Sequence, residues 1–504
     1  MQSQKILFAL IFKLSKYALS FVFFYLVVLF YEPGTIGLVQ FAVAFTALFS
    51  FIFNLGFDVA HLKIYPEEEN KSRSIGTLLT INCIFISFSL IFYFFLLLFL
   101  NFNMNVVYIL IIFIVDLIVQ NISTSFSNIL IADNELLKGT FPWVVISTSK
   151  IVLIVIGLFL FPTNEFILSL IYLASSLLHC FVLLIYIIPY KISKPSKKIM
   201  HKYLKFTYPL IIYNIVIAIS TNIGLVLIDF WISTEAVAFY YAGDHLSVFR
   251  TVIPTIITTI MISIFSKNLA EKKLDKNKQI IKRISKYAGI FYGVAILLSF
   301  LYSNYIIILL LGKTYESSIF IFNILVLTHI IVINDVGVFT DLNARGLTKL
   351  YSIINILGEI YLIVLIFIFI APFGLNFGIK GLAIAIFFKY LTYTPIVRLF
   401  LWYKFKYAYN FNIFLDLLVI YVIYFANIIF LNIVKINLFT YFYLIPLLMV
   451  INIFLYFIIL YLLRTIKRED LRYFKLFLNI KSLINMLYKD LSIKQNNFEK
   501  NNEK

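Results

Sequence analysis

Residues 106–131, VVYILIIFIVDLIVQNISTSFSNILI, decide the fold of this chain. Asp116 is the one charged residue in this stretch, and the residues before it are apolar. A helix needs about 20 predominantly apolar residues to cross the hydrocarbon core of a bilayer, so the stretch predicts a transmembrane helix. Its polar residues fall on one helical face, at the spacing of Asp116, Gln120, Thr124 and Ser127. We expect this face to point away from lipid, because polar groups are costly there.

Stretches of the same kind recur along the whole chain. Hydrophobic residues make up 62% of it and charged residues 13%, against about 25% charged residues in an ordinary soluble domain. The pattern therefore predicts an all-α polytopic membrane protein with about 14 transmembrane helices. We place the spans at residues 15–31, 36–60, 76–100, 106–131, 143–161, 167–189, 206–231, 236–264, 287–311, 319–340, 350–371, 380–401, 412–433 and 439–463.

Lysine and arginine alternate in abundance from one loop to the next. Most of the 42 basic residues fall in the two termini and every second loop, whereas the other loops hold only Lys313, Lys380 and Lys435. Basic loops face the cytoplasm in multi-pass membrane proteins, so both termini are expected on the cytoplasmic side of the plasma membrane. The formal net charge of +18 accordingly predicts contact with anionic membrane lipids and not with nucleic acid.

The chain divides into two halves with a basic connection between them. Residues 32–37, EPGTIG, open the second span, and residues 234–239, TEAVAF, open the eighth, six spans later. An even number of spans makes the halves parallel repeats, related by an axis along the membrane normal. We therefore expect an N-terminal bundle at 1–190, a cytoplasmic linker at 191–205, a C-terminal bundle at 206–402, two additional helices at 412–463 and a basic cytoplasmic tail at 464–504.

Ionisable residues within the spans are costly in lipid, so each is a hypothesis for a functional site. Lys150, Arg250 and Lys389 together would give a positively charged cavity, suited to an anionic head group such as a lipid-linked diphosphate sugar. The simpler interpretation is a set of fixed ion pairs, with Asp116 as the first partner to test for Arg250. Glu359 is the expected partner of Lys389. The other candidates for this cavity are polar residues of the spans: Asp116, Gln120, Asn121, Asn214 and Asn222.

Three residues are candidates for coupling transport to a proton or a sodium ion. They are Asp58 and His61, near the end of the second span, and Asp116. Histidine titrates near neutral pH, which suits a proton-linked role, although snorkelling to the membrane surface explains Asp58 and His61 as well. The chain has no nucleotide-binding loop, metalloprotease spacing or nucleophile elbow, so we expect a transporter without cofactor or metal, and not an enzyme.

Short motifs are spread over the chain: EPGTIG at 32–37, LGFDVAH at 55–61, YPL at 208–210, EAVAFY at 235–240 and GIKGLAIA at 378–385. Together they resemble the polysaccharide flippase family, within the superfamily that also holds the MATE drug exporters. Gly381-Leu-Ala departs from the more frequent Gly-Ala-Ala of that family. The resemblance implies two six-helix bundles, related by pseudo-twofold symmetry around a central cavity, and two added C-terminal helices. It also implies that a lipid-linked oligosaccharide, of the polyprenyl diphosphate type, is moved between leaflets by alternating access.

Three other functions remain open at this point. A structural scaffold that binds partners through its basic loops would have no cavity. An ion-coupled exporter of small molecules, of the MATE type, would have a cavity dominated by carboxylates and aromatic rings. A membrane-embedded glycosyltransferase or polymerase would need clustered carboxylates at one membrane face.

Overall fold

The structure, a computed structural model, describes residues 2–53, 55–100, 102–407, 412–434, 438 and 441–466, and these residues are helical without a β-strand. The first half holds α1 (Gln2–Phe30), α2 (Pro33–Leu48), η1 (Ser50–Ile52), α3 (Phe57–Ile64), η2 (Tyr65–Glu67), α4 (Lys71–Phe99), α5 (Met104–Ala132), α6 (Leu136–Thr140), α7 (Pro142–Leu160) and α8 (Glu165–Ile187). The second half holds α9 (Lys197–Trp231), α10 (Thr234–Leu246), α11 (Phe249–Ala270), α12 (Leu274–Leu311), η3 (Lys313–Tyr315), α13 (Ser318–Ala344), α14 (Thr348–Ile370), α15 (Lys380–Phe388), η4 (Lys389–Tyr393) and α16 (Thr394–Phe405). Beyond it lie α17 (Asn412–Val434), η5 (Phe442–Leu444) and α18 (Ile445–Leu462). Residues 467–504 of the expected tail fall outside the described residues.

The helices confirm a polytopic all-α membrane protein. Within the described residues, 12 helices are long and apolar enough to cross a membrane, and a bent pair, Pro33–Leu48 with Ser50–Glu67, raises the number to 13. The remaining expected span, 236–264, corresponds to α10 and α11, which are two separate helices. The count of 14 crossings therefore stays a prediction.

The eighth expected span is broken at Ser247, a few residues before a proline. The Ser247 hydroxyl donates to the Asp244 carbonyl at 2.7 Å, which closes the turn between α10 and α11. Within α11, Pro254 has no N–H to donate to the carbonyl of Arg250, four residues earlier. The hydroxyl of Tyr292 on α12 donates to that carbonyl at 2.9 Å. Neighbouring side chains thus satisfy the backbone where the helix is irregular, as an apolar environment requires.

The second expected span is broken at the equivalent place in the first half. α2 ends at Leu48, and α3 begins after Gly56, whose φ of 98° lies in the left-handed region. A Cβ atom at Gly56 would also meet the Asn214 amide nitrogen of α9 at 3.1 Å. Both conditions favour glycine. The two broken spans, six positions apart in the predicted order, agree with the expected internal repeat.

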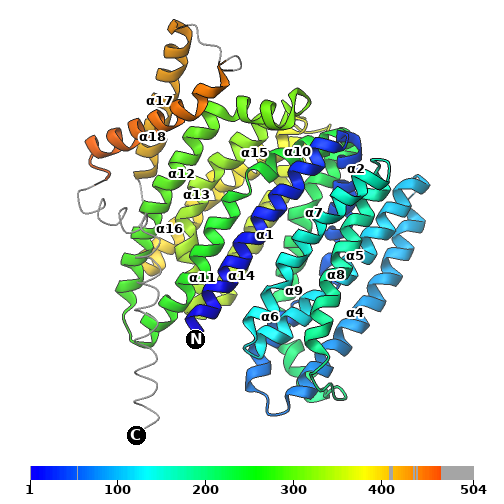
Figure 1. The fold of residues 1–504 in the computed structure, drawn as a ribbon. Helices are drawn as coiled ribbons and strands as arrows, with labels where there is room; N and C mark the ends of the chain where they lie inside the picture. Colours follow the sequence, from blue (N-terminus) through cyan, green and yellow to red (C-terminus); the bar gives the residue numbers. More distant parts are fainter. Residues whose placement is uncertain are drawn as a thin grey trace.

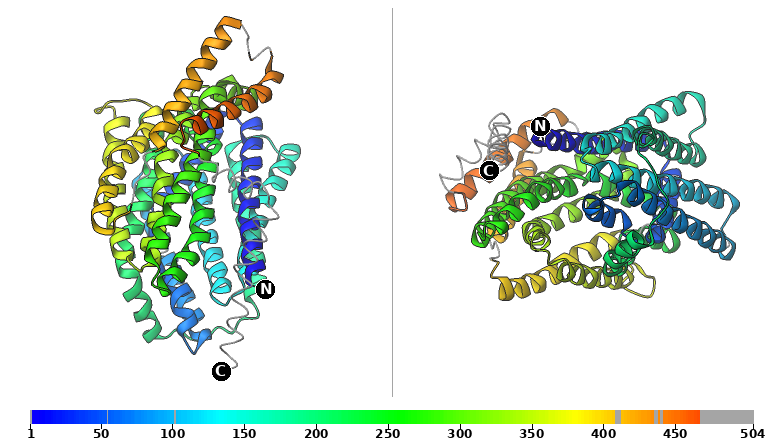
Figure 2. Two further views of the ribbon diagram at one scale, coloured as in Figure 1. Left: turned by 90° about the vertical axis from the view of Figure 1, so that its left-hand side faces the viewer. Right: turned by 90° about the horizontal axis from the view of Figure 1, so that it is seen from below.

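The two halves lie side by side and meet at α2 and α10 (Figures 1 and 2). A Cβ atom on Gly37 of α2 would lie 1.8 Å from the carbonyl oxygen of Thr234, at the start of α10, so the two backbones touch there. α9 contacts both halves, because α3 and α4 pack against it on one side and α14 on the other. The irregular connection before α9 covers 188–196 and is shorter than the expected linker, since α9 begins at Lys197.

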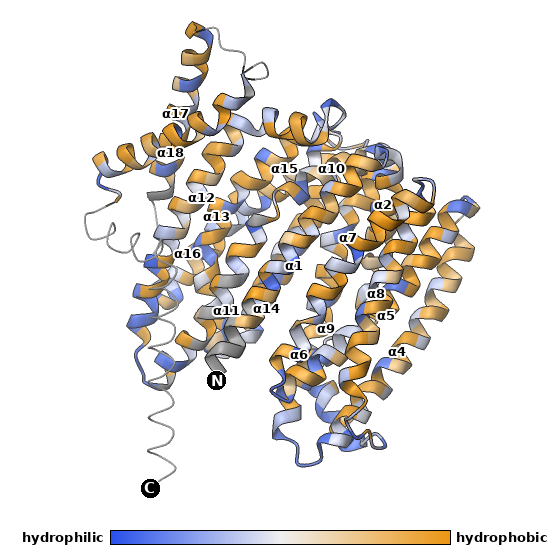
Figure 3. Cartoon of the chain, viewed as in Figure 1, coloured by the Kyte–Doolittle hydropathy of each residue, from blue (hydrophilic) through white to orange (hydrophobic). Residues whose placement is uncertain are grey.

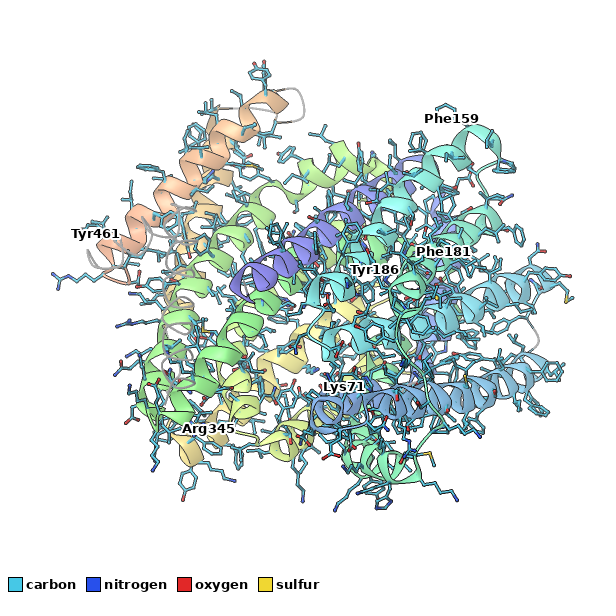
Figure 4. The ribbon with its side chains drawn as sticks, turned by 60° about the horizontal axis from the view of Figure 1, so that its bottom comes forward. Lys71, Phe159, Phe181, Tyr186, Arg345 and Tyr461 are labelled. Atoms are coloured by element: carbon cyan, nitrogen blue, oxygen red, sulfur yellow. The ribbon has the colours of Figure 1, made fainter. Side chains whose placement is uncertain are left out.

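Apolar side chains cover the outside of the helices, and polar ones are found inside. Phe159 points outward in Figure 4 and is 85% exposed, whereas Ser176 on the adjacent α8 is completely buried. Hydrophilic residues concentrate at one end of the molecule, the lower end in Figure 3, which we call the basic end. Helix α6, which contains Lys138, lies toward this end. This inverted distribution is that of a protein whose solvent is lipid.

Candidate functional site

The polar face of α5 is turned inward, as expected. Asp116 is 4% exposed, and Gln120 Nε2 donates to its Oδ2 at 2.7 Å. Further along the face, Thr124 donates to the Gln120 carbonyl at 2.8 Å, and Ser127 donates to the carbonyl of Gly139 at 2.6 Å. The second carboxylate oxygen of Asp116, Oδ1, is buried, and the Ser176 hydroxyl of α8 lies beside this carboxyl group. Asp116 therefore lies in the protein interior, between polar groups of α5 and α8.

Lys150 on α7 is held by aromatic rings. Its Nζ lies 4.0 Å from the ring centre of Tyr172 and 5.6 Å from that of Phe23. No carboxylate oxygen of the described residues lies within 4.0 Å of this ammonium, although its charge interacts with that of Asp116. Cation–π contacts hold a lysine in place without cancelling its charge. The Lys150 ammonium is therefore positioned but not neutralised.

The rings around Lys150 connect the two halves. Tyr172 on α8 accepts a hydrogen bond from Gln40 of α2 at 3.3 Å. The hydroxyl groups of Tyr172 and Tyr241 of α10 are also hydrogen-bonded to each other. Tyr241 contacts the ring of His245, with ring centres 4.4 Å apart. Lys150 and Asp116 thus lie where the first half meets α10.

Arg250, on α11, pairs with Asp244 of α10. The expectation that Asp116 is its first partner was therefore wrong. Asp244 and Arg250 are six residues apart, which would separate them on a continuous helix. The break at Ser247 brings them together. Since His245 lies beside Asp244, the ion pair is close to the junction that holds Lys150.

Lys389 lies elsewhere and is neutralised. Its Nζ is 2.6 Å from Glu359 Oε1 on α14, so the expected pairing of these two residues is confirmed. Lys389 opens the π-helix η4, a single wide turn between α15 and α16. The structure thus brings Lys150 near the Arg250 ion pair but places Lys389 in a contact of its own. The three residues do not form a group of three free positive charges.

The three asparagine candidates are spread over two helices. Asn121 of α5 has a buried Oδ1 without a partner among the described residues. Asn214 lies against Gly56, at the start of α3. Asn222 donates to the Ala218 carbonyl of its own helix at 2.8 Å. Their assignment to a substrate site stays a prediction.

Asp58 and His61 are buried, at 3% and 0% exposure, so snorkelling does not describe them. Asp58 Oδ1 accepts a hydrogen bond from Ser125 of α5 at 2.9 Å. His61 Nδ1 is 2.7 Å from the hydroxyl of Tyr203 on α9, which is also 2.8 Å from the Ser74 hydroxyl on α4. The pair therefore joins α3 to three other helices. No group of three or more His, Cys, Asp and Glu in the described residues is placed to hold a metal ion.

Sequence reasoning missed three residues near this site. Lys16 is at the start of the first expected span, 15–31. Its Nζ lies 4.0 Å from the ring centre of Trp143 on α7. Trp143 in turn contacts His179 of α8, with ring centres 4.8 Å apart. A repeat of polar and aromatic residues at i, i+4 and i+7 in each helix was the available signal, but aromatic residues are too frequent in this chain to stand out.

The fold occurs in known transporters. Lipid II flippase MurJ in an inward closed conformation is similar with a TM-score of 0.72 at 17% identity, covering 89% of this chain and 97% of that one. An inward-facing multidrug resistance MATE family transporter of the MOP superfamily has a TM-score of 0.64 at 13% identity, with 77% and 93% covered. A MOP superfamily transporter from Pyrococcus furiosus has a TM-score of 0.58 at 13% identity, with 79% and 94% covered.

Sequence comparison gives the family. No curated protein matches the chain. Residues 3–269, more than half of the chain, match the family described as polysaccharide biosynthesis protein. This match includes the first half, the broken second and eighth spans and every residue around Lys150. The chain belongs to the polysaccharide biosynthesis protein family.

Proposed function

We propose that this protein moves a lipid-linked oligosaccharide across the plasma membrane by alternating access. Its family and its similarity in fold to a lipid II flippase support this function. The observation that carries the proposal is the Lys150 ammonium, which lies at the junction of the two halves with no described carboxylate within 4.0 Å. A positive charge within a membrane span is costly unless it is paired or faces a polar cavity, and an anionic passenger would supply that pairing.

The passenger enters from the basic end, with both termini in the cytoplasm. Its lipid tail stays in the bilayer, in contact with membrane lipids, and its head group lies between the two halves. A polyprenyl diphosphate carrier is consistent with this arrangement, because its phosphates would supply a negative counter-charge for the Lys150 ammonium. The polar candidates Gln120, Asn121, Asn214 and Asn222 are assigned to contacts with the sugar. α2 and α10 then separate while the basic end closes.

A proton or sodium ion is proposed to drive the cycle. Asp116 is the first candidate, because it is a buried carboxyl group beside Ser176 and its charge interacts with that of Lys150. Asp58 and His61 are the second, because they join α3 to α4, α5 and α9 through hydrogen bonds. Asp116→Asn is expected to remove the dependence of transport on an ion gradient and to leave head-group binding in place.

The direct test measures the leaflet on which lipid-linked sugar accumulates. Deletion of the protein is expected to leave synthesis undiminished and to trap the substrate in the inner leaflet. Lys150→Ala is expected to reproduce that defect at a normal amount of folded protein. Arg250→Ala is the matched comparison, because its charge is compensated by Asp244. Unchanged flipping on deletion, or reduced synthesis, would contradict the proposal.

An ion-coupled exporter of small molecules is the second candidate. It is favoured by the buried carboxyl group of Asp116 and by the rings of Tyr172 and Tyr241 close by. The site, however, holds Lys150 and Arg250 beside Asp116 and Asp244, and Lys16 adds a further positive charge on α1. This excess of cations favours an anionic passenger. Efflux of a cationic dye by the purified protein in liposomes would support the exporter instead.

A further inference from the structure

Two carboxylates take equivalent places at the basic end of the two halves. Asp133 directly follows α5, which is the fourth expected span, and Asp341 lies in the last turn of α13, which is the tenth. These spans are six positions apart, as the expected internal repeat requires. Lys71 and Arg345, which pair with the two carboxylates, are labelled at the same end of the molecule in Figure 4. The repeat thus places one carboxylate at the basic end of each half.

Side chains at the ends of three other spans donate to Asp133. The Tyr65 hydroxyl, just after α3, lies 3.2 Å from Oδ1, and the Lys71 Nζ, at the start of α4, lies 3.0 Å from the same oxygen. The Tyr190 hydroxyl, shortly after α8, donates to Oδ2 at 3.1 Å. These four residues, which we call the first-half clasp, join the basic ends of the second, third, fourth and sixth expected spans.

Donors from the matching spans surround Asp341 in the second half. Asn277, at the start of α12, donates from Nδ2 to Oδ1 at 2.7 Å, and the Tyr407 hydroxyl, shortly after α16, donates to Oδ2. Asn268, in the last turn of α11, donates in turn to Asn277 Oδ1 at 2.7 Å. Asp341, Asn277, Tyr407 and Asn268 form the second-half clasp. It joins the basic ends of the eighth, ninth, tenth and twelfth expected spans.

The two clasps follow one plan with different side chains. In each half a tyrosine that follows the sixth or twelfth span, Tyr190 or Tyr407, donates to the carboxylate at the end of the fourth or tenth. The first-half clasp is partly open to water, because the Asp133 side chain is 28% exposed, whereas Asp341 is completely buried. In both, one carboxylate collects bonds from several helices, and such a network fixes the helix ends relative to one another.

The broken spans lie between these clasps and the contact of the two halves. α3 and α11 are on the clasp side of the breaks at Gly56 and Ser247, whereas α2 and α10 are on the other side, where they contact each other. Gly56 has a φ of 98°, and the Ser247 N–H donates to the carbonyl of Asp244, three residues earlier, where an α-helix uses the fourth. Irregular backbone between two regular segments can absorb a rotation as a hinge.

We propose that the two clasps keep the basic end of each half as one rigid body, and that transport turns these bodies about the breaks at Gly56 and Ser247. The inference rests on the proposed alternating access. In this structure α2 contacts α10 away from the basic end, so the basic ends approach each other when the passenger is released on the opposite side. Asp133 and Asp341 are positioning residues of this cycle, because they act through the helices that they hold and not on the passenger.

Distances between spin labels test the rigid bodies in the full-length protein. Cys83 and Cys180, the two cysteines of the chain, are replaced by alanine, and exposed positions receive the labels. The pairs are Arg73 with Ile188 within the first half, Lys276 with Lys404 within the second, and Arg73 with Lys276 between the halves. The protein in nanodiscs is measured with and without a polyprenyl diphosphate that carries a neutral oligosaccharide. The distance between the halves is expected to change by about 2 Å or more, and each distance within a half by less than about 1 Å.

Variants that lack one hydroxyl test whether the clasps cause this rigidity. Tyr190→Phe is expected to broaden the distance distribution within the first half alone, and Tyr407→Phe that within the second half alone. Tyr403→Phe is the matched control, because Tyr403 lies one turn before Tyr407 and is 77% exposed, and it should change neither distribution. A distance within a half that follows the distance between the halves, or unchanged distributions in both clasp variants, would overturn the proposal.

A covalent link distinguishes a rigid clasp from one that opens during transport. Lys71→Cys with Tyr190→Cys removes two donors to Asp133 and is expected to slow the flipping of the polyprenyl diphosphate-linked oligosaccharide about fivefold, the effect of a single hydrogen bond. Joining the two cysteines with a flexible bis-maleimide is expected to restore flipping. A complete block on cross-linking would mean that the clasp must open, and the proposal would be wrong.

The two kinds of measurement separate this inference from the function on which it rests. Wild-type protein that flips no oligosaccharide, or whose halves keep one distance in every condition, would contradict the proposed function. The spin-label distributions of Tyr190→Phe and Tyr407→Phe would still decide whether the clasps hold the helix ends together. Normal flipping with distances that vary within a half would leave the function standing and reject the rigid bodies.

Discussion

The two halves of the molecule treat buried positive charges differently. In the second half, four cations each have a carboxylate within 4.0 Å: Arg250 with Asp244, Arg345 with Asp341, Lys389 with Glu359 and Arg398 with Asp335. In the first half, Lys16 and Lys150 lie over aromatic rings and have no such partner among the described residues. A compensated charge holds helices together, whereas an uncompensated one is available to a ligand. The comparison separates structural charges from binding charges.

The largest expected effect tests the structural side of this comparison. Asp341 is completely buried and accepts hydrogen bonds from Asn277 at 2.7 Å, from Arg345 at 2.9 Å and from Tyr407. Asp341→Ala leaves Arg345 without its partner, and the free energy of unfolding is expected to fall by about 3–5 kcal/mol. The effect is measured by heating the protein in detergent and recording how much monodisperse protein remains at each temperature.

Asp133 is the matched control for Asp341, because it has a similar arrangement in the first half. It follows α5, and it accepts from Lys71 at 3.0 Å, Tyr190 at 3.1 Å and Tyr65 at 3.2 Å. Lys71 and Arg345 are labelled at the same end of the molecule in Figure 4. The Asp133 side chain is 28% exposed, so Asp133→Ala should cost less than about 1 kcal/mol. Equal losses in the two variants would break the distinction between the halves.

The next effect concerns a charge pair within the membrane. Lys389→Met leaves the Glu359 carboxylate without its ammonium, at an expected cost of about 3 kcal/mol. The double variant Glu359→Gln with Lys389→Met should recover most of that loss, because it leaves no unpaired charge. Lys150→Met is the comparison from the first half and should cost less than about 1 kcal/mol, since it leaves no ion pair broken. A large loss for Lys150→Met would show that its charge is structural as well.

A smaller effect tests a buried hydroxyl group that joins helices of the first half to α9. The Tyr203 hydroxyl is hydrogen-bonded to His61 and Ser74, which connects α9 to α3 and α4. Tyr203→Phe is expected to lower stability by about 1 kcal/mol, the value of a typical hydrogen bond. Tyr208→Phe is the control, because Tyr208 is on the same helix and 76% exposed. Thermal unfolding of the two variants side by side would show whether the buried hydroxyl matters.

Periodicity and spacing allowed much of this to be predicted from the sequence. The inward face of α5 followed from the spacing of Asp116, Gln120 and Ser127. Arg345 and Asp341 are four residues apart, and that spacing predicts their ion pair on a regular helix. These predictions rest on local geometry, which one sequence contains.

Contacts that depend on irregular backbone or on three-dimensional packing could not be predicted. The Asp244–Arg250 pair requires the break at Ser247, and a continuous span was expected there. Lys16 lies at the start of the first expected span, 15–31, and nothing in its local sequence predicts its contact with Trp143 of α7. Which helices pack against α1 depends on the whole fold. The site of Lys16, Trp143 and His179 therefore emerged only from the structure.

The smallest expected effect is a pH dependence of the Asp133 contacts. Burial opposes ionisation of this carboxyl, but hydrogen bonds from Lys71 and Tyr190 and the charge of Lys71 outweigh it, so the pKa of Asp133 lies below its ordinary value. A depressed folded-state pKa adds stability above the unfolded-state value of about 3.9, and that stability disappears as the pH falls through the folded-state value. The free energy of unfolding of the wild type should therefore be larger than that of Asp133→Asn by about 0.3 kcal/mol. This difference should stay constant from about pH 5 to pH 8. The two should converge below about pH 4. A difference that grows on acidification would mean that Asp133 is stabilised in its protonated form, which the ammonium of Lys71 disfavours.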